Sequence, residues 1–264
     1  MNNEIQKRVL EHFNYIKQFY PEDQILGVFA YGSMNYGTYI KGISDVDTKA
    51  IIIPTFRELC LNDKPVSREL HFENGEHCEI KDIREIVKMF KKQNINFLEI
   101  LFTEYYWLNP MYKVLWKIYF CQFKEDIARF DENKAWQSII GQAIHTLKQN
   151  PTNGKKISNG YRLLYFLEQY KEGKPYLECI KPTEENLATL LQFKKCNYLS
   201  GNYAEDLIER FEEMKEFRFP EKDNSKLNNW LDNGIEYGIR HLDNIRKEPW
   251  RWKYDGESDL SETK

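Results

Sequence analysis

The stretch "YGSMNYGTYIKGISDVDTKAIIIP", residues 31–54, joins two apolar segments through a glycine-containing turn and a pair of carboxylates. Just before it, "QILGVFAYG" (residues 24–32) has the continuous apolar character of a buried strand. At its end, "VDTKAIIIP" (residues 46–54) predicts a second strand, which Pro54 ends. The stretch therefore predicts two strands with polar groups gathered where they meet: Gly32, Ser33, Asp45 and Asp47.

The rest of the first half predicts a small sheet with flanking helices. Residues 3–20 carry an apolar stripe at helical spacing and are followed by Pro21. Asn74-Gly75 lies between two alternating segments, which is a strong hairpin signal. A further helix is expected from about residue 82 to residue 92.

After about residue 120, helical periodicity replaces the strand signals. We expect the fold class α+β, with a mixed α and β domain over residues 1–122 and a helical domain over residues 123–264. The expected helices of the second domain are 133–149, 155–172, 184–195, 203–217 and 226–246.

Composition excludes some classes of protein. The net charge of −3 gives no general attraction to nucleic acid, so a polyanion would need a local cluster of Lys and Arg. No window approaches the roughly 18 apolar residues of a membrane span. The N-terminal residues are polar and amphipathic, and the five cysteines are scattered with no CxxC pair. These features predict a cytoplasmic protein with reduced thiols and no membrane partner.

Asp45 and Asp47 are two residues apart at the expected start of a strand, where alternate side chains share a face. Their Cα atoms would then be about 6.6 Å apart, at about 3.3 Å per residue. Two carboxylates this close repel each other unless a cation lies between them. Mg²⁺ resolves the conflict, because it favours one or two carboxylates together with substrate phosphate oxygens. A cap or turn is the ordinary role of either Asp taken singly.

The Gly-Ser turn supplies groups that suit the phosphate. Gly32 has no Cβ, so a phosphate can approach its backbone closely. We expect Ser33 to open a helix whose first amide groups favour an anion. A strand, Gly-Ser, eleven residues and Asp-Val-Asp before a second strand form an ordered set that is far more specific than either dipeptide.

This ordered set resembles the signature of the polymerase-β-like nucleotidyltransferase superfamily. Within it, "YGSMNYGTYIKGISDVD" is similar to a predicted-nucleotidyltransferase branch associated with RNA repair in bacteria and phages. The branch has a second glycine, here Gly37, and a serine before the first aspartate, here Ser44. Asn94 and Glu99 in "IREIVKMFKKQNINFLEILF" match further recurring positions, and the likeness covers about residues 25–210.

The resemblance implies a polymerase-β-like domain followed by a helical domain, and a cofactor of Mg²⁺ or Mn²⁺. An acceptor hydroxyl would attack the α-phosphate of a nucleoside triphosphate (NTP), releasing pyrophosphate, with three carboxylates holding the metal ions. Asp45 and Asp47 fill two places. Glu79 is our candidate for the third as catalytic residue and metal ligand, and His77, on the same strand face, is the alternative.

The resemblance also implies a Lys and a His-x-x-Arg step at the helix after the first domain. Lys156 and Arg162 match as nucleotide-binding residues, whereas Asn159 replaces the His. Arg can grip phosphate through its fork, and Lys acts as a point charge. Two solvated charges on a helix are the alternative interpretation.

The acceptor stays open among an RNA end, a protein hydroxyl and a small molecule, and the oligomeric state is not indicated. A non-catalytic module that binds nucleotide or nucleic acid is the competing hypothesis. An RNA acceptor would need a local basic surface. Its candidates are Lys155, Lys156 and Arg162, then Lys194 and Lys195, then Arg246, Lys247, Arg251 and Lys253. The last three lie in "KEPWRWKY" (residues 247–254), whose aromatic residues could stack on bases or pack on the helical domain.

Overall fold

The computed structural model describes residues 2–247. Its first half contains a five-stranded mixed sheet with the strand order β3-β4-β2-β1-β5. Strands β2 and β4 are parallel, and the other neighbouring pairs are antiparallel. The strands are β1 (Ile25–Tyr31), β2 (Asp47–Ile52), β3 (Ser67–His71), β4 (His77–Asp82) and β5 (Tyr106–Leu108).

Both faces of the central strands are buried, which explains their continuous apolar sequence. On one face, Val28 and Ile52 pack against the apolar stripe of α1 (Asn2–Ile16). On the other face, Phe29 and Ile51 belong to the larger core formed with the remaining helices. The alternation of side chains along a strand sends neighbouring residues into these two cores.

Short helices connect and cover the sheet. The hairpin between β3 and β4 turns at Gly75, whose φ of 84° is in the left-handed region that glycine favours. Helix α3 begins after the cap Asp82, whose side chain accepts a hydrogen bond from the amide of Arg84. The helices of this part are α2 (Phe56–Cys60), α3 (Ile83–Lys91), α4 (Ile95–Leu98), α5 (Lys113–Leu115) and α6 (Lys124–Ala128).

The second half of the described chain is helical, as expected. Its helices are α7 (Glu132–Gln149), α8 (Gly154–Lys171), α9 (Tyr176–Ile180), α10 (Glu184–Lys195), α11 (Asn202–Met214) and α12 (Ser225–Lys247). The predicted α+β class, with a sheet first and helices after it, is therefore confirmed at this level. None of the helices in residues 2–247 is long and apolar enough to cross a membrane.

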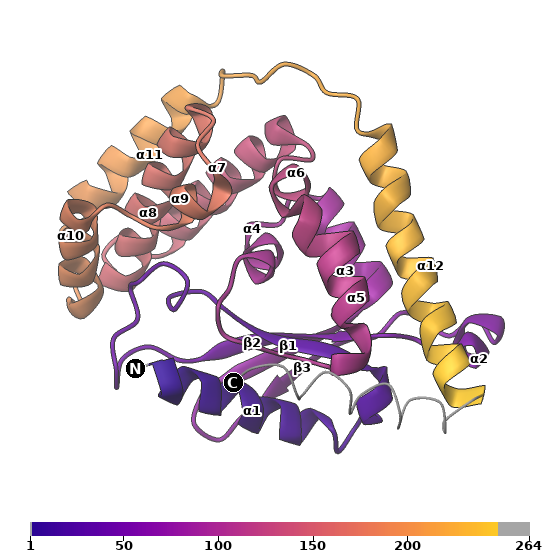
Figure 1. Ribbon diagram of the computed structural model, residues 1–264. Helices are drawn as coiled ribbons and strands as arrows, with labels where there is room; N and C mark the ends of the chain where they lie inside the picture. The colour runs from indigo at the N-terminus through magenta and orange to yellow at the C-terminus, as the bar shows by residue number, and fades with distance from the viewer. Residues whose placement is uncertain (1, 248–264) are drawn as a thin grey trace, which may run out of the picture.

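Helix α12 packs on the first half of the chain and not on α7 to α11. Figure 1 shows it beside α3 and α5, far from α7 to α11, and the chain crosses over to reach it. His241 hydrogen-bonds the carbonyl of Met111 at 2.8 Å, and Arg246 pairs with Asp23 at 2.7 Å. The last strand, β5, ends at Leu108, and α12 packs on the first part of the chain rather than on the helices that precede it. The boundary expected at residue 122 stays a prediction.

Candidate functional site

The Gly-Ser turn follows β1 directly and is built from consecutive turns. The amide of Asn35 donates to the carbonyl of Gly32 at 2.9 Å, and that of Thr38 donates to the carbonyl of Ser33 at 3.0 Å. The expectation that Ser33 opens a helix is wrong, because residues 32–37 form turns. Positive φ angles of 89° at Gly32 and 74° at Gly37 turn the chain in a way that a right-handed helix does not allow.

The turn is hydrogen-bonded to a buried carboxylate, that of Glu99. Glu99 is fully buried, and its Oε2 accepts a hydrogen bond from the amide of Gly32 at 3.1 Å. The hydroxyl of Tyr36 donates to the other oxygen of Glu99. Burial raises the pKa of Glu99, and the nearby guanidinium of Arg162 opposes that rise. The Gly32 amide is thus hydrogen-bonded to Glu99, and this bond fixes the turn at the end of β1.

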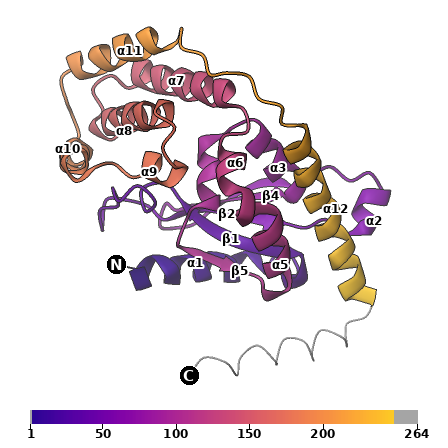
Figure 2. The ribbon, with the colours of Figure 1, turned by 45° about the horizontal axis from the view of Figure 1, so that its top comes forward.

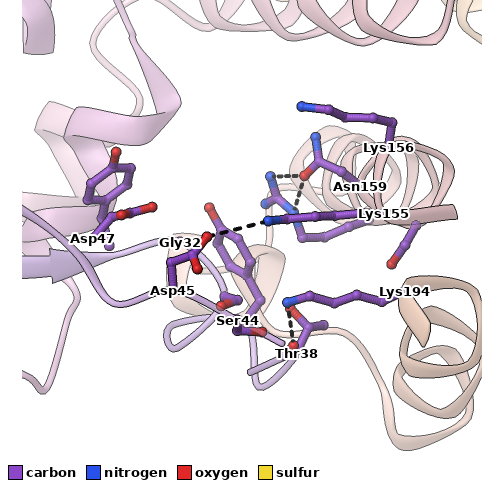
Figure 3. Close-up of a pocket in the computed structure, with 14 residues that line it drawn as sticks. Gly32, Thr38, Ser44, Asp45, Asp47, Lys155, Lys156, Asn159 and Lys194 are labelled. Atoms are coloured by element: carbon purple, nitrogen blue, oxygen red, sulfur yellow. Dashed lines mark hydrogen bonds and ion pairs between the residues drawn. The ribbon is translucent and has the colours of Figure 1, made fainter. Parts of the chain in front are cut away.

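The two aspartates face different partners. Asp47 opens β2, and its Oδ1 lies 2.8 Å from Nδ1 of His77 and 3.2 Å from the His77 amide. Asp45 precedes the strand, and its Oδ2 lies 3.7 Å from Nζ of Lys155. Figure 3 shows the Asp45 carboxylate directed at Lys155 across the cavity. Both carboxylates are partly exposed, so oxygens of each are open to a cation and its ligands.

Glu79, the sequence candidate for the third carboxylate, is paired with two lysines of the sheet. Parallel pairing sets Lys49 of β2 opposite Glu79 of β4, and Nζ of Lys49 lies 2.5 Å from Oε2 of Glu79. Lys81 approaches the other oxygen of Glu79 at 3.0 Å. The residue beside Asp47 is His77, whose pKa is raised by its hydrogen bond to that aspartate. The structure therefore brings His77 to Asp47 and binds Glu79 to two lysines.

The buried Lys49 explains the position of Glu79. Its side chain is almost fully buried, and its ammonium group lies over the rings of Tyr31 at 4.0 Å and Phe97 at 3.9 Å. Burial lowers the pKa of Lys49, and the Glu79 carboxylate opposes that shift. Over residues 2–247, no set of three His, Cys, Asp or Glu side chains is arranged to hold a metal ion. Asp45 and Asp47 are the carboxylates of this part of the chain that line the cavity described below.

Positive groups of the helical part face the aspartates. The first turn of α8 carries Lys155 and Lys156, and α10 carries Lys194 near its end. Helices α8 and α10 can approach closely because Gly154 has no side chain: a Cβ there would lie 2.0 Å from the carbonyl oxygen of Cys196. Figures 1 and 2 both place α8 and α10 above the loop that leaves β1.

Arg162 and Lys194 are the most buried of these cations. The Arg162 guanidinium stacks on the ring of Tyr36 at 3.7 Å, and its Nε and Nη2 donate to Oδ1 of Asn159 at 3.1 and 3.0 Å. Its Nη1 is buried and has no hydrogen-bond partner. Lys194 donates to the carbonyl of Thr38 at 2.7 Å, and burial, together with Lys155, lowers its pKa to about 8.

These groups line one cavity of about 190 Å³, drawn in Figure 3. Of the residues predicted from the sequence as a site, the cavity wall contains Gly32, Ser33, Asp45, Asp47, Lys156 and Arg162. Glu79 is not part of this wall. Lys155, Asn159 and Lys194 also line the cavity, although the sequence did not predict them as nucleotide-binding residues. The two lysines were candidates for an RNA surface, and Asn159 is the residue that replaces the His of the resembling branch.

Among the described residues, candidates for a basic RNA surface are found in two different places. Lys155, Lys156 and Lys194 line the cavity, whereas Arg246 is paired with Asp23 on α12's side of the molecule. The aromatic residues of "KEPWRWKY", namely Trp250, Trp252 and Tyr254, and the cations Arg251 and Lys253 lie outside the described residues.

Comparison with known proteins does not assign the chain. No family model matches it, and no curated protein matches it. The class of protein must therefore be inferred from the cavity itself.

Proposed function

We propose that the chain is a Mg²⁺-dependent nucleotidyltransferase with a polymerase-β-like catalytic domain. One observation carries the proposal: a single cavity has two aspartates at the start of β2 on one wall and three lysines and an arginine on the other. A polyphosphate that carries a divalent cation has matching charges, because the cation meets the carboxylates and the phosphates meet the cations. Gly32 and Ser33 of the Gly-Ser turn line the same cavity.

The donor set fits Mg²⁺ that arrives with its nucleotide. Mg²⁺ keeps several waters and takes one or two carboxylates plus substrate phosphates, so Asp45 and Asp47 satisfy its protein ligands. When bound, the metal neutralises charge that develops on the transferring phosphoryl group. Mn²⁺ has the same preference for carboxylate and phosphate oxygens.

The protein's own groups bind and orient the substrate. Lys156, Lys194 and Arg162 attract the terminal phosphates, and the Arg162 fork can bond two oxygens at once. Held in this way, the α-phosphate lies toward the aspartates. The acceptor hydroxyl oxygen forms a bond to the α-phosphorus, the bond to the β-phosphate oxygen breaks, pyrophosphate leaves, and the hydroxyl proton passes to solvent.

Labelled nucleotides test the proposal. The full chain is incubated with Mg²⁺ and each α-labelled NTP in the presence of RNA, of a protein mixture or of the chain alone. We expect label to become acid-stable on one acceptor and pyrophosphate to appear in equal amount. An RNA end, a protein hydroxyl and a small molecule are the acceptors that the sequence leaves open. Absence of both products with every acceptor and nucleotide would remove the proposal.

A non-catalytic nucleotide-binding module is the second candidate. The observation that favours it is the pairing of Glu79 with Lys49 and Lys81, which leaves no third carboxylate beside the aspartates among the described residues. Such a module would bind NTP with Mg²⁺ and release it unchanged. Calorimetric binding without pyrophosphate release would support this candidate over the enzyme.

A further inference from the structure

The peptide between the two aspartates is held by a residue outside the sequence motif. Oε1 of Glu76 accepts a hydrogen bond from the amide of Val46 at 3.3 Å. Glu76 lies just after the hairpin turn between β3 and β4 and is only 7% exposed. Because Val46 separates Asp45 from Asp47, this bond fixes the backbone from which both carboxylates project.

The carboxylate of Glu76 is itself clamped by α1. Its Oε2 accepts hydrogen bonds from the guanidinium of Arg8, at 2.9 Å from Nε, and lies 3.1 Å from Nε2 of His12. A buried carboxylate costs free energy unless it is paired and hydrogen-bonded, and Arg8 and His12 supply both. The orientation of Glu76 is therefore determined by the N-terminal helix.

His12 contacts both Glu76 and Thr48, the residue that follows Asp47. It is fully buried and stacks on Phe72, with ring centroids 4.0 Å apart. Its Nδ1 lies 2.9 Å from Oγ1 of Thr48. The residues on both sides of Asp47 are thus held by one cluster: Val46 through Glu76, and Thr48 through His12.

We propose that Glu76 is a positioning residue for the Asp45 and Asp47 pair, and that α1 acts on the cation site through it. The proposal rests on the proposed function, because it assumes that the aspartates bind the metal. Glu76 is not among the residues that line the cavity. Its part is to keep the Val46 peptide from rotating, since rotation there would swing the Asp45 side chain. Groups that orient metal ligands commonly change metal affinity by about 10- to 100-fold when they are altered.

Glu76→Gln and Glu76→Met form a matched pair that tests this role. Both remove the charge that Arg8 and His12 compensate, and both keep nearly the same length. Only Gln retains an oxygen that can accept from the Val46 amide. Both variants should therefore lose thermal stability, whereas Met alone should raise the Mn²⁺ dissociation constant with bound NTP by about 10-fold. Electron paramagnetic resonance of free Mn²⁺ gives this constant without any turnover.

Hydrogen exchange at the Val46 amide supplies a readout that does not depend on metal. The Met variant should exchange this amide faster than the Gln variant, measured well below both melting temperatures. Arg8→Met is a milder variant that leaves Glu76 in place, and it should fall between wild type and Glu76→Met in both measurements.

The outcomes separate this proposal from the proposed function. Equal Val46 exchange and equal Mn²⁺ affinity in the Gln and Met variants would overturn the positioning role. Faster Val46 exchange in the Met variant with unchanged Mn²⁺ affinity would also overturn it, because the bond would then be structural only. If Asp45→Asn binds Mn²⁺ and NTP as wild type does, the metal site of the proposed function is wrong instead.

Discussion

The cavity has two walls, and they are built in different ways. The sheet wall contains Gly32, Asp45 and Asp47, and the helical wall contains Lys155, Lys156, Arg162 and Lys194. On the sheet wall, the amides of Gly32 and Val46 each donate to a buried carboxylate, Glu99 and Glu76 respectively. On the helical wall, Lys155 has an exposed side chain that meets Asp45 only at 3.7 Å. Exposed ion pairs of this kind contribute little to stability. The difference teaches that the sheet wall sets the geometry of the site, while the helical wall supplies positive charge.

If the sheet wall sets the geometry of the site, its two aspartates should control turnover. Asp45→Asn and Asp47→Asn keep the shape of the side chain and remove the charge that a divalent cation needs. We expect each to lower kcat/KM by about 10³-fold or more, which corresponds to several kcal/mol of lost charge stabilisation. Pyrophosphate release at saturating Mg²⁺ and NTP measures the effect.

The fold should survive these changes, and thermal melting is the control. Asp45→Asn loses only an exposed contact with Lys155, so its free energy of unfolding should change by less than about 1 kcal/mol. Normal turnover by either variant would show that the sheet wall does not hold the metal.

A smaller effect is expected on the helical wall, and on affinity more than on turnover. Arg162→Lys keeps one charge but loses the fork that can bond two phosphate oxygens. We expect the dissociation constant for NTP to rise about 30-fold, or about 2 kcal/mol, with a smaller change in kcat. Isothermal titration with a non-hydrolysable NTP and Mg²⁺ gives the constant.

Arg210→Lys is the matched control for this change. Arg210 is another arginine on a helix, α11, but it pairs with Glu168 at 3.1 Å and is not part of the cavity wall. Its substitution should leave NTP affinity unaltered. A loss of affinity equal to that of Arg162→Lys would mean that general charge, rather than the cavity wall, binds the nucleotide.

Substitutions of His77 and Glu79, both in β4, test the residues beside Asp47. His77 contacts Asp47, so we expect His77→Gln to lower kcat by about 10-fold through misplacement of that aspartate. Glu79→Gln leaves the buried ammonium group of Lys49 without its charged partner, so it should lower the free energy of unfolding by about 2 kcal/mol. Parallel measurements of kcat and melting temperature separate the two effects.

The choice of Glu79 as third carboxylate, made from the sequence, stays a prediction that this pair of variants decides. A large fall in kcat for Glu79→Gln with unchanged NTP affinity would support that choice. It would also mean that Glu79 leaves Lys49 when substrate binds.

The sequence predicted the parts of the fold that depend on local pattern. The strands around residues 31–54 and five helices of the second half follow from apolar runs and helical spacing. Strand β5 was not predicted, since its three residues are too few for a periodic signal. The docking of α12 on α3 was missed because an amphipathic face does not specify which surface it covers.

The candidate site was predictable where residues are adjacent in sequence, or where the resemblance supplied a position, as for Lys156 and Arg162. The Gly-Ser and Asp-Val-Asp residues form a compact motif, whereas Glu76, Glu99 and Lys49 owe their positions to contacts far along the chain. The sequence did carry one local signal for the cluster of Glu76, Arg8 and His12. His12 lies on the apolar stripe of the first helix, between Val9 and Ile16, where a polar side chain must find a buried partner.

The smallest effect concerns Lys194, the half-buried cation that joins the two walls through the carbonyl of Thr38. Its pKa in the free protein is lowered to about 8 by burial and by Lys155, against the attraction of Asp45. Below pH 8 the side chain is an ammonium group, and above it the charge is lost. The affinity for Mg²⁺-free tripolyphosphate should therefore fall as the pH rises through about 8, by about fivefold for the loss of one charged hydrogen bond. Lys194→Arg keeps its charge throughout this range, so its affinity should not show this fall. Calorimetric titrations of both proteins across the range give the comparison, and identical pH profiles would show that Lys194 does not contribute charge to the helical wall.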